Sequence, residues 1–139
     1  MSESNQYLPH GSYLLTAKDV EVSINAISTR VDGSHNPNAA VTYPATEARH
    51  IGDIINENGN LVVGGGNGSR PNPTNQFGVF VPAGSYQLTS IGIHVTIQAL
   101  CKKIDGSWVR SVPVRYTAKD AAQLADISNI DGQLTLAEK

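Results

Sequence analysis

Two stretches of the chain alternate strictly between apolar and polar residues. Residues 20–26 read V-E-V-S-I-N-A, and residues 93–99 read I-H-V-T-I-Q-A. A period of two places every second side chain on the same face of a β-strand. Both stretches therefore predict strands with one packed face and one face that is open to polar residues.

Tight turns are predicted where Asp or Asn precedes Gly. Both residue types accept a positive φ, which the two central residues of a two-residue hairpin turn require. Outside the glycine-rich segment 64–75, the chain contains four such dipeptides, at Asp32-Gly33, Asn58-Gly59, Asp105-Gly106 and Asp131-Gly132. We expect a β-hairpin at each of them.

The remaining elements are predicted to be short. Residues 13–16 and 86–89 each follow a Gly-Ser pair and are interpreted as short strands. Residues 46–49 and 117–122 favour helical turns, and each begins with a threonine that suits an N-cap. The predicted fold class is all-β with short helical turns.

The chain contains an internal repeat with an offset of 73 residues. Of the 53 positions from Pro9 to Leu61, 21 carry the same residue type 73 positions later, so that Gly11 matches Gly84 and Asn56 matches Asn129. A fixed offset that persists through turns and apolar runs indicates one structural unit used twice. Any binding site built on that unit is expected to occur twice.

The two repeats are separated by a segment of linker composition. Residues 64–75 read GGGNGSRPNPTN, which combines flexible glycines with stiffer prolines. A phosphate-binding loop would need Gly-Lys-Ser/Thr and a helix after the glycines, and Arg-Pro follows instead. We therefore predict a single domain over residues 1–139, with repeat one at 9–63, a linker at 64–81 and repeat two at 82–136.

Composition excludes several classes of function. A net charge of −2 argues against nucleic-acid binding, which needs a basic surface. The repeats differ, with three basic and six acidic residues in 9–63 against five and four in 82–136. No apolar run is long enough for a membrane span or a signal peptide, and Cys101 is the only cysteine. We expect a cytoplasmic protein, with non-classical release as an alternative, and neither a metal nor a cofactor.

Taken in order and repeated, these motifs resemble the cyanovirin-N homologue family of lectins. The resemblance covers about Gly11 to Leu136 and rests on the two Gly-Ser-Tyr openings, the Asp-Gly turns and the closing N-I-D-G-Q-L of residues 129–134. It implies a pseudo-twofold, strand-exchanged all-β fold. It also implies recognition of high-mannose glycans, mostly α1,2-linked mannose, through up to two pockets and without catalysis.

The resemblance also implies which residues form the pockets. The first pocket combines an opening segment, a hairpin turn and the closing hairpin of the other repeat, and comprises Ser12, Thr16, Thr29, Arg30, Val31, Asn129, Ile130 and Asp131. The second comprises Ser85, Gln87, Thr89, Lys102, Lys103, Asn56, Glu57 and Asn58. Short side chains that donate and accept hydrogen bonds suit the paired hydroxyls of a sugar.

Two features depart from the family pattern. Leu15 and Leu88 replace a polar pocket residue, and Val31 and Ile104 replace polar hairpin residues. Ala17 with Ser28, and Ser90 with Cys101, occupy the positions of the two family disulfides, so neither bridge is present. The alternative function is accordingly a protein-interaction domain that keeps the fold with degenerate sugar pockets. With either function, we expect a monomer or a domain-swapped homodimer.

An enzyme is not expected. The repeated acids Asp53/Asp126 and Asp32/Asp105 occupy turn or cap positions and do not indicate the carboxylate pair of a glycosidase. Cys101 is interpreted as a packed thiol rather than a nucleophile. For Trp108, stacking on a sugar face and packing back onto the sheet remain equally open.

Overall fold

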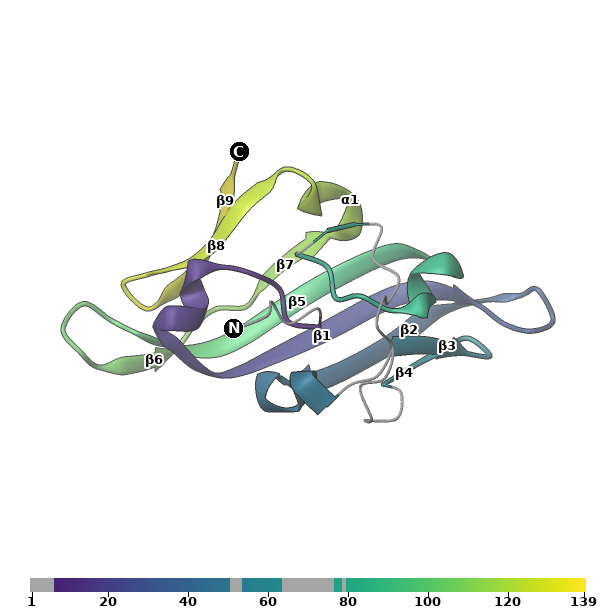
Figure 1. Ribbon diagram of the computed structural model, residues 1–139, viewed down its shortest axis with the longest axis horizontal. Helices are drawn as coiled ribbons and strands as arrows, with labels where there is room; N and C mark the ends of the chain where they lie inside the picture. The colour runs from purple at the N-terminus through teal and green to yellow at the C-terminus, as the bar shows by residue number, and fades with distance from the viewer. Residues whose placement is uncertain (1–6, 51–53, 64–76, 79) are drawn as a thin grey trace.

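The computed structural model describes residues 7–50, 54–63, 77–78 and 80–139, so most of the predicted linker and Asp53 lie outside the described residues. The fold is mostly β, as predicted (Figure 1). Its elements in chain order are η1 (Ser12–Leu15), β1 (Ala17–Thr29), β2 (His35–Pro44), η2 (Ala45–His50), β3 (Ile54–Glu57), β4 (Asn60–Val63), η3 (Ser85–Leu88), β5 (Ser90–Lys102), β6 (Trp108–Arg110), β7 (Val114–Thr117), α1 (Ala118–Ala121), β8 (Leu124–Ile130) and β9 (Gln133–Glu138).

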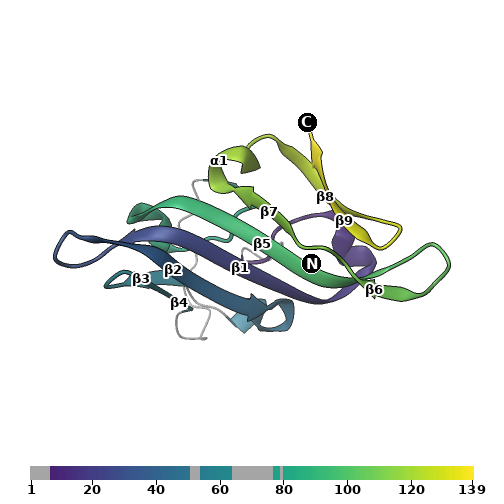
Figure 2. The same cartoon turned by 180° about the vertical axis from the view of Figure 1, so that it is seen from behind.

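One antiparallel sheet forms the body of the molecule. Its strand order is β2-β1-β5-β6. β7 also pairs with β5, along residues 94–97, whereas β6 pairs along residues 100–102. The hairpins β3–β4 and β8–β9 are separate two-stranded sheets that lie on opposite sides of the long central strands (Figures 1 and 2). The two central strands, β1 and β5, each have 13 residues and therefore run the length of the body.

The alternating stretches form the central strands, and one of their faces is buried. Val22, Ile24, Val95 and Ile97 are fully buried in the core, while the polar residues between them, such as Ser23, lie on the other face. The predicted half-buried strands are thus confirmed. Removing these apolar side chains from water is a main stabilising contribution to the sheet.

The register of β1 and β5 is symmetric with respect to the sequence repeat. Val22 pairs with Ile97, and Ile24 pairs with Val95. Ser23 pairs with Thr96, which is its own counterpart because 96 − 23 equals 73. The pairing is therefore centred on Ser23 and Thr96.

The two segments predicted to be short opening strands are 3-10 helices instead. In η1, the N–H groups of Leu14 and Thr16 donate to the carbonyl oxygens of Gly11 and Tyr13, and η3 repeats this pattern. The hydroxyl of Tyr13 is buried and donates to the carbonyl oxygen of Pro9, four residues earlier, at 2.7 Å. This local bond fits a turn of helix and not an extended strand, in which residues four apart lie far from each other.

The positions expected to match the family disulfides do not pair within a repeat. Ala17 and Ser28 lie at opposite ends of the extended β1, so no bridge between them is geometrically allowed. Ala17 lies opposite Cys101, and Ser28 lies opposite Ser90, with 2.8 Å between their hydroxyl oxygens. These four residues therefore join the two repeats across the central strand pair.

The two closing turns agree with their sequence motifs. Asn58 and Gly59 have φ values of 51° and 92°, and Asp131 and Gly132 have values of 47° and 91°. Positive φ at both central residues is the geometry of the expected two-residue hairpin turn. At the predicted helical turn near residue 117, the hydroxyl of Thr117 accepts from the N–H of Asp120 and caps α1.

Candidate functional site

A single asparagine side chain, Asn129, joins three chain segments at one end of the sheet. Its Nδ2 donates to Thr16 Oγ1 and to the carbonyl oxygen of Lys102, both at 2.9 Å. Its Oδ1 accepts from the N–H of Gly132 at 2.8 Å. We call the residues gathered here the Asn129 cluster: Ser12, Thr16, Lys102, Lys103, Asn129, Ile130 and Asp131.

Asn56, the counterpart of Asn129, does the same at the other end. Its Nδ2 donates to Thr89 Oγ1 and to the carbonyl oxygen of Thr29, both at 2.9 Å. Its Oδ1 accepts from the N–H of Gly59 at 2.7 Å. The residues here form the Asn56 cluster: Thr29, Arg30, Asn56, Glu57, Asn58 and Thr89. The predicted pocket residue Ser85 lies in η3, which contacts β3.

The closing turns supply a second link at each end. Asp131 Oδ1 accepts from the N–H of Ile104 at 2.9 Å, and Asn58 Oδ1 accepts from the N–H of Val31 at 2.9 Å. Each closing hairpin is thereby fixed to the turn that follows a long central strand. Asn58 and Asp131, which belong to the expected sugar pockets, thus already accept hydrogen bonds within the fold through their Oδ1 atoms.

The structure groups the predicted residues differently from the expectation. Thr29 and Arg30 were expected beside Thr16, but they lie in the Asn56 cluster, and Lys102 and Lys103 lie with Thr16 instead. The reason is the extended β1: 13 residues at about 3.3 Å each place its two ends roughly 40 Å apart. The hairpin turns are therefore exchanged between the two predicted sets.

Gln87 belongs to neither cluster. Only 2% of its surface is exposed, and its Nε2 donates to the carbonyl oxygen of Pro82 at 2.9 Å. Leu88 and Thr89, which follow it, are exposed. The predicted pocket residue Gln87 is therefore buried beside Pro82 instead of being exposed with Leu88 and Thr89.

Asp126 was predicted to occupy a turn or cap position, but it lies within β8 and contacts Ser12. Its two carboxylate oxygens accept from the backbone N–H of Ser12 at 2.8 Å and from the Ser12 hydroxyl at 2.6 Å. The hydroxyl and then the N–H of Ser12 hold the pKa of Asp126 below its usual value. The sequence did contain a signal, since Ser12 and Asp126 both recur at the offset of 73 as Ser85 and Asp53.

Asp126 is expected to make stability depend on acidity. A carboxylate with a lowered pKa in the folded state stabilises it above the unfolded pKa of about 3.9, and this contribution is lost as pH falls through the folded pKa. We expect the wild-type protein to lose more stability between pH 7 and pH 2.5 than Asp126→Asn, as measured by urea unfolding at each pH. Ser12→Ala should likewise flatten the dependence. Equal acid losses in wild type and Asp126→Asn would contradict this role.

Each cluster retains exposed polar groups of different charge. In the Asn129 cluster, the Lys102 side chain is exposed and makes no hydrogen bond or ion pair within the described residues, and Asp131 has a second carboxylate oxygen. In the Asn56 cluster, Glu57 is exposed in the place of Ile130. Arg30 there donates from Nη1 to Ser34 Oγ and to the carbonyl oxygen of His35. The two ends therefore offer different partners to a polar ligand.

Large apolar side chains flank both clusters. Beside the Asn129 cluster, Leu15 is 86% exposed and Ile104 is 89% exposed. Beside the Asn56 cluster, the counterparts Leu88 and Val31 are 66% and 90% exposed. Such exposed apolar groups around polar ones are typical of contact surfaces.

The surroundings of Trp108 and Cys101 bear on the roles considered for them. Lys18 places its ammonium 4.3 Å from the centre of the Trp108 ring, which is 40% exposed, so this face of the ring already holds a cation. Cys101 is buried, and burial raises the pKa of its thiol, which fits a packed residue. Within the part of the chain that the structure describes, no group of His, Cys, Asp and Glu is arranged to hold a metal ion.

Comparison with known proteins adds no further constraint. Among the described residues, no helix has the length and apolar character needed to cross a membrane. Searches against protein-family models, curated proteins and solved structures found no match for this chain.

Proposed function

We propose that the protein is a carbohydrate-binding lectin for mannose-type glycans, with one site on each end cluster and a pseudo-twofold, cyanovirin-N-like arrangement in which the repeats exchange segments. The observation that carries this proposal is the pair of clusters around Asn129 and Asn56. Each cluster combines an opening turn of one repeat with the closing hairpin of the other. This agrees with the segment exchange that the resemblance implies, although the hairpin turns are assigned to the opposite ends.

The chemistry of the exposed groups supports a polar, hydroxyl-bearing ligand. Thr16 Oγ1 accepts from Asn129, which leaves its own proton available to donate, and the free oxygen of Asp131 can accept. The asparagines hold these groups in place before a ligand arrives. Such preorganisation lowers the entropic cost of binding.

The first test is a chemical-shift titration with α1,2-linked mannobiose. Shifts are expected in the residues of one or both clusters. Lys102→Ala and Glu57→Ala each remove a side chain that the fold does not use, and each should weaken binding at its own end by about two- to tenfold, the loss of one hydrogen bond. Each variant is the control for the other end.

Two results would count against the lectin function. The first is a spectrum that stays unchanged at millimolar mannobiose. The second is an equal loss of affinity at both ends in each single variant, which would indicate a general effect on the fold. Asn129 and Asn56 are unsuitable for this test because their replacement would disturb the fold itself.

The alternative is a protein-interaction domain, and the exposed apolar residues favour it. Leu15 and Ile104 flank the Asn129 cluster, Ile130 belongs to it, and all three are more than half exposed. Burying such side chains on a protein partner would be favourable, whereas a small sugar would leave most of them in water. Leu15→Ala should weaken binding to a protein partner strongly and to mannobiose only slightly.

A further inference from the structure

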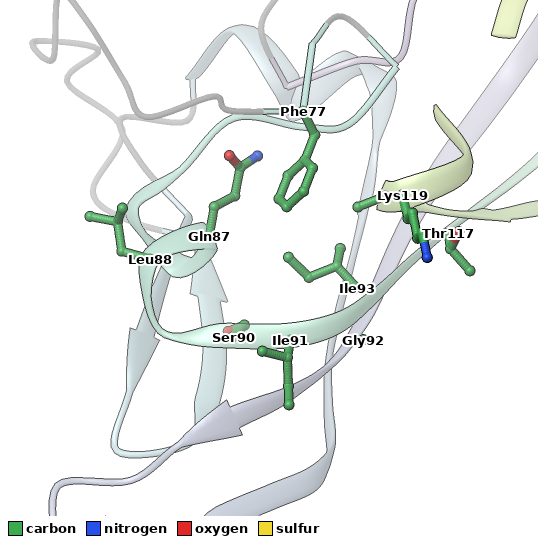
Figure 3. A pocket seen from close by; sticks show the side chains of 10 residues that line it. Phe77, Gln87, Leu88, Ser90, Ile91, Gly92, Ile93, Thr117 and Lys119 are labelled. Carbon is green, nitrogen blue, oxygen red and sulfur yellow. The ribbon is translucent and has the colours of Figure 1, made fainter. Parts of the chain in front are cut away.

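A cavity of about 600 Å³ lies where η3 and the start of β5 approach α1, and it shares Leu88 with the border of the Asn56 cluster. Its walls are mainly apolar and include Phe77, Leu88 and Ile93, and Thr117 and Lys119 stand at its α1 side (Figure 3). In Figure 3 the Phe77 ring lies between the Gln87 and Lys119 side chains and faces Ile93. The volume falls within the range of small-molecule sites in proteins.

The polar groups inside the cavity already have partners. Gln87 Nε2 donates to the carbonyl oxygen of Pro82, and the Ser90 hydroxyl shares a hydrogen bond with Ser28. A sugar with many hydroxyls would find few partners on these walls. The interior therefore suits an apolar body.

Among the described residues, the rim offers one cation and one hydroxyl donor. Lys119 is exposed and forms no ion pair within the described residues. Thr117 Oγ1 accepts from the N–H of Asp120, which leaves its own O–H free to donate. None of the cavity-lining residues that the structure describes is acidic. A ligand that carries one negative charge on an apolar body matches this distribution.

This chemistry is specific to the second repeat. The counterparts of Gln87 and Lys119 in the first repeat are Leu14 and Thr46, and the counterpart of Ile91 is Lys18. Packing that both repeats share does not require these differences. Lys119 gives the cavity its ammonium group, and Ile91 adds an apolar residue to its lining.

We propose that this cavity binds a small amphiphilic anion, an aromatic or aliphatic ring body with a single carboxylate or sulfonate that pairs with Lys119. The proposal does not depend on sugar binding, because it concerns another ligand class and residues that belong to neither cluster. It applies whether or not the end clusters recognise glycans.

The test is a fluorescence titration of the full chain with 1-anilinonaphthalene-8-sulfonate. The wild-type protein should bind one equivalent in a saturable manner. Leu88→Ala should lower the affinity by about threefold or more, since it removes apolar wall. Leu15→Ala, the same change at the counterpart position outside the cavity, is the matched control and should leave the affinity unchanged.

The role of charge is tested with Lys119→Thr, which installs the residue of the first repeat. Affinity for the sulfonate probe should fall by about three- to tenfold, while affinity for the neutral N-phenyl-1-naphthylamine should stay the same. Lys119 is exposed, so this variant should fold normally, with an unchanged urea midpoint. Non-saturable binding, equal losses in Leu88→Ala and Leu15→Ala, or equal losses for both probes in Lys119→Thr would overturn the proposal.

Discussion

Alanine at position 11 is expected to lower the free energy of unfolding by about 3 kcal/mol, the sum of an overpacking cost and a backbone cost. Its Cβ would lie 2.5 Å from the carbonyl oxygen of Ile127 and 2.8 Å from Cδ1 of Tyr13. The first contact is with backbone, which cannot rotate away. Gly11 also has a φ of 157° with a ψ of 157°, a region that is almost restricted to glycine. Urea unfolding of Gly11→Ala measures the loss.

Gly33→Ala is the matched control. Gly33 has a φ of 91°, but a Cβ there would meet no atom within 4 Å, so only the backbone cost of about 1–2 kcal/mol is expected. Gly84→Ala should repeat the large effect, because its Cβ would lie 2.5 Å from the carbonyl oxygen of Ile54. Equal stabilities of Gly11→Ala and Gly33→Ala would contradict the close approach of the opening turn to the closing hairpin.

Asn129→Ala is expected to destabilise the protein by about 2–4 kcal/mol in the absence of any sugar. The change removes the donor to Thr16 Oγ1 and to the Lys102 carbonyl oxygen, and the acceptor for the N–H of Gly132. The three segments at that end would lose their common partner. Denaturant unfolding of the ligand-free protein measures this effect.

Asn129→Asp separates the two halves of the side chain's role. It keeps an acceptor for the N–H of Gly132 but has no amide donor for Thr16 and Lys102, so its stability should lie between that of wild type and Asn129→Ala. A variant Asn129→Ala with wild-type stability and no mannobiose binding would instead make Asn129 a direct sugar ligand.

Local structure was largely predictable where a local backbone geometry requires a particular type of residue. The Asn58-Gly59 and Asp131-Gly132 dipeptides sufficed for the closing hairpins because both positions need positive φ. The alternation around Val22 and Val95 sufficed for the buried face of the central strands. In both cases the information lies within a few neighbouring residues.

The arrangement of the candidate sites was less predictable because it depends on strand pairing. Alternation shows which face of β1 is buried but not which strand lies beside it, so Ala17 was not expected opposite Cys101. Asn56 and Asn129 were interpreted only as ligand-binding residues, since their bonds to Thr89 and Thr16 span 33 and 113 positions. No local pattern contains such contacts.

The placement of Ser23 opposite Thr96 has a consequence for association between chains. A strand pair centred on equivalent positions is self-complementary, so two β1 strands from different molecules have the side-chain pattern to form the same ladder with Ser23 opposite Ser23. A single repeat would thus carry an isologous interface within its own longest strand. In the tandem chain, β1 and β5 form this interface within one molecule, so each strand always has its partner at high effective concentration.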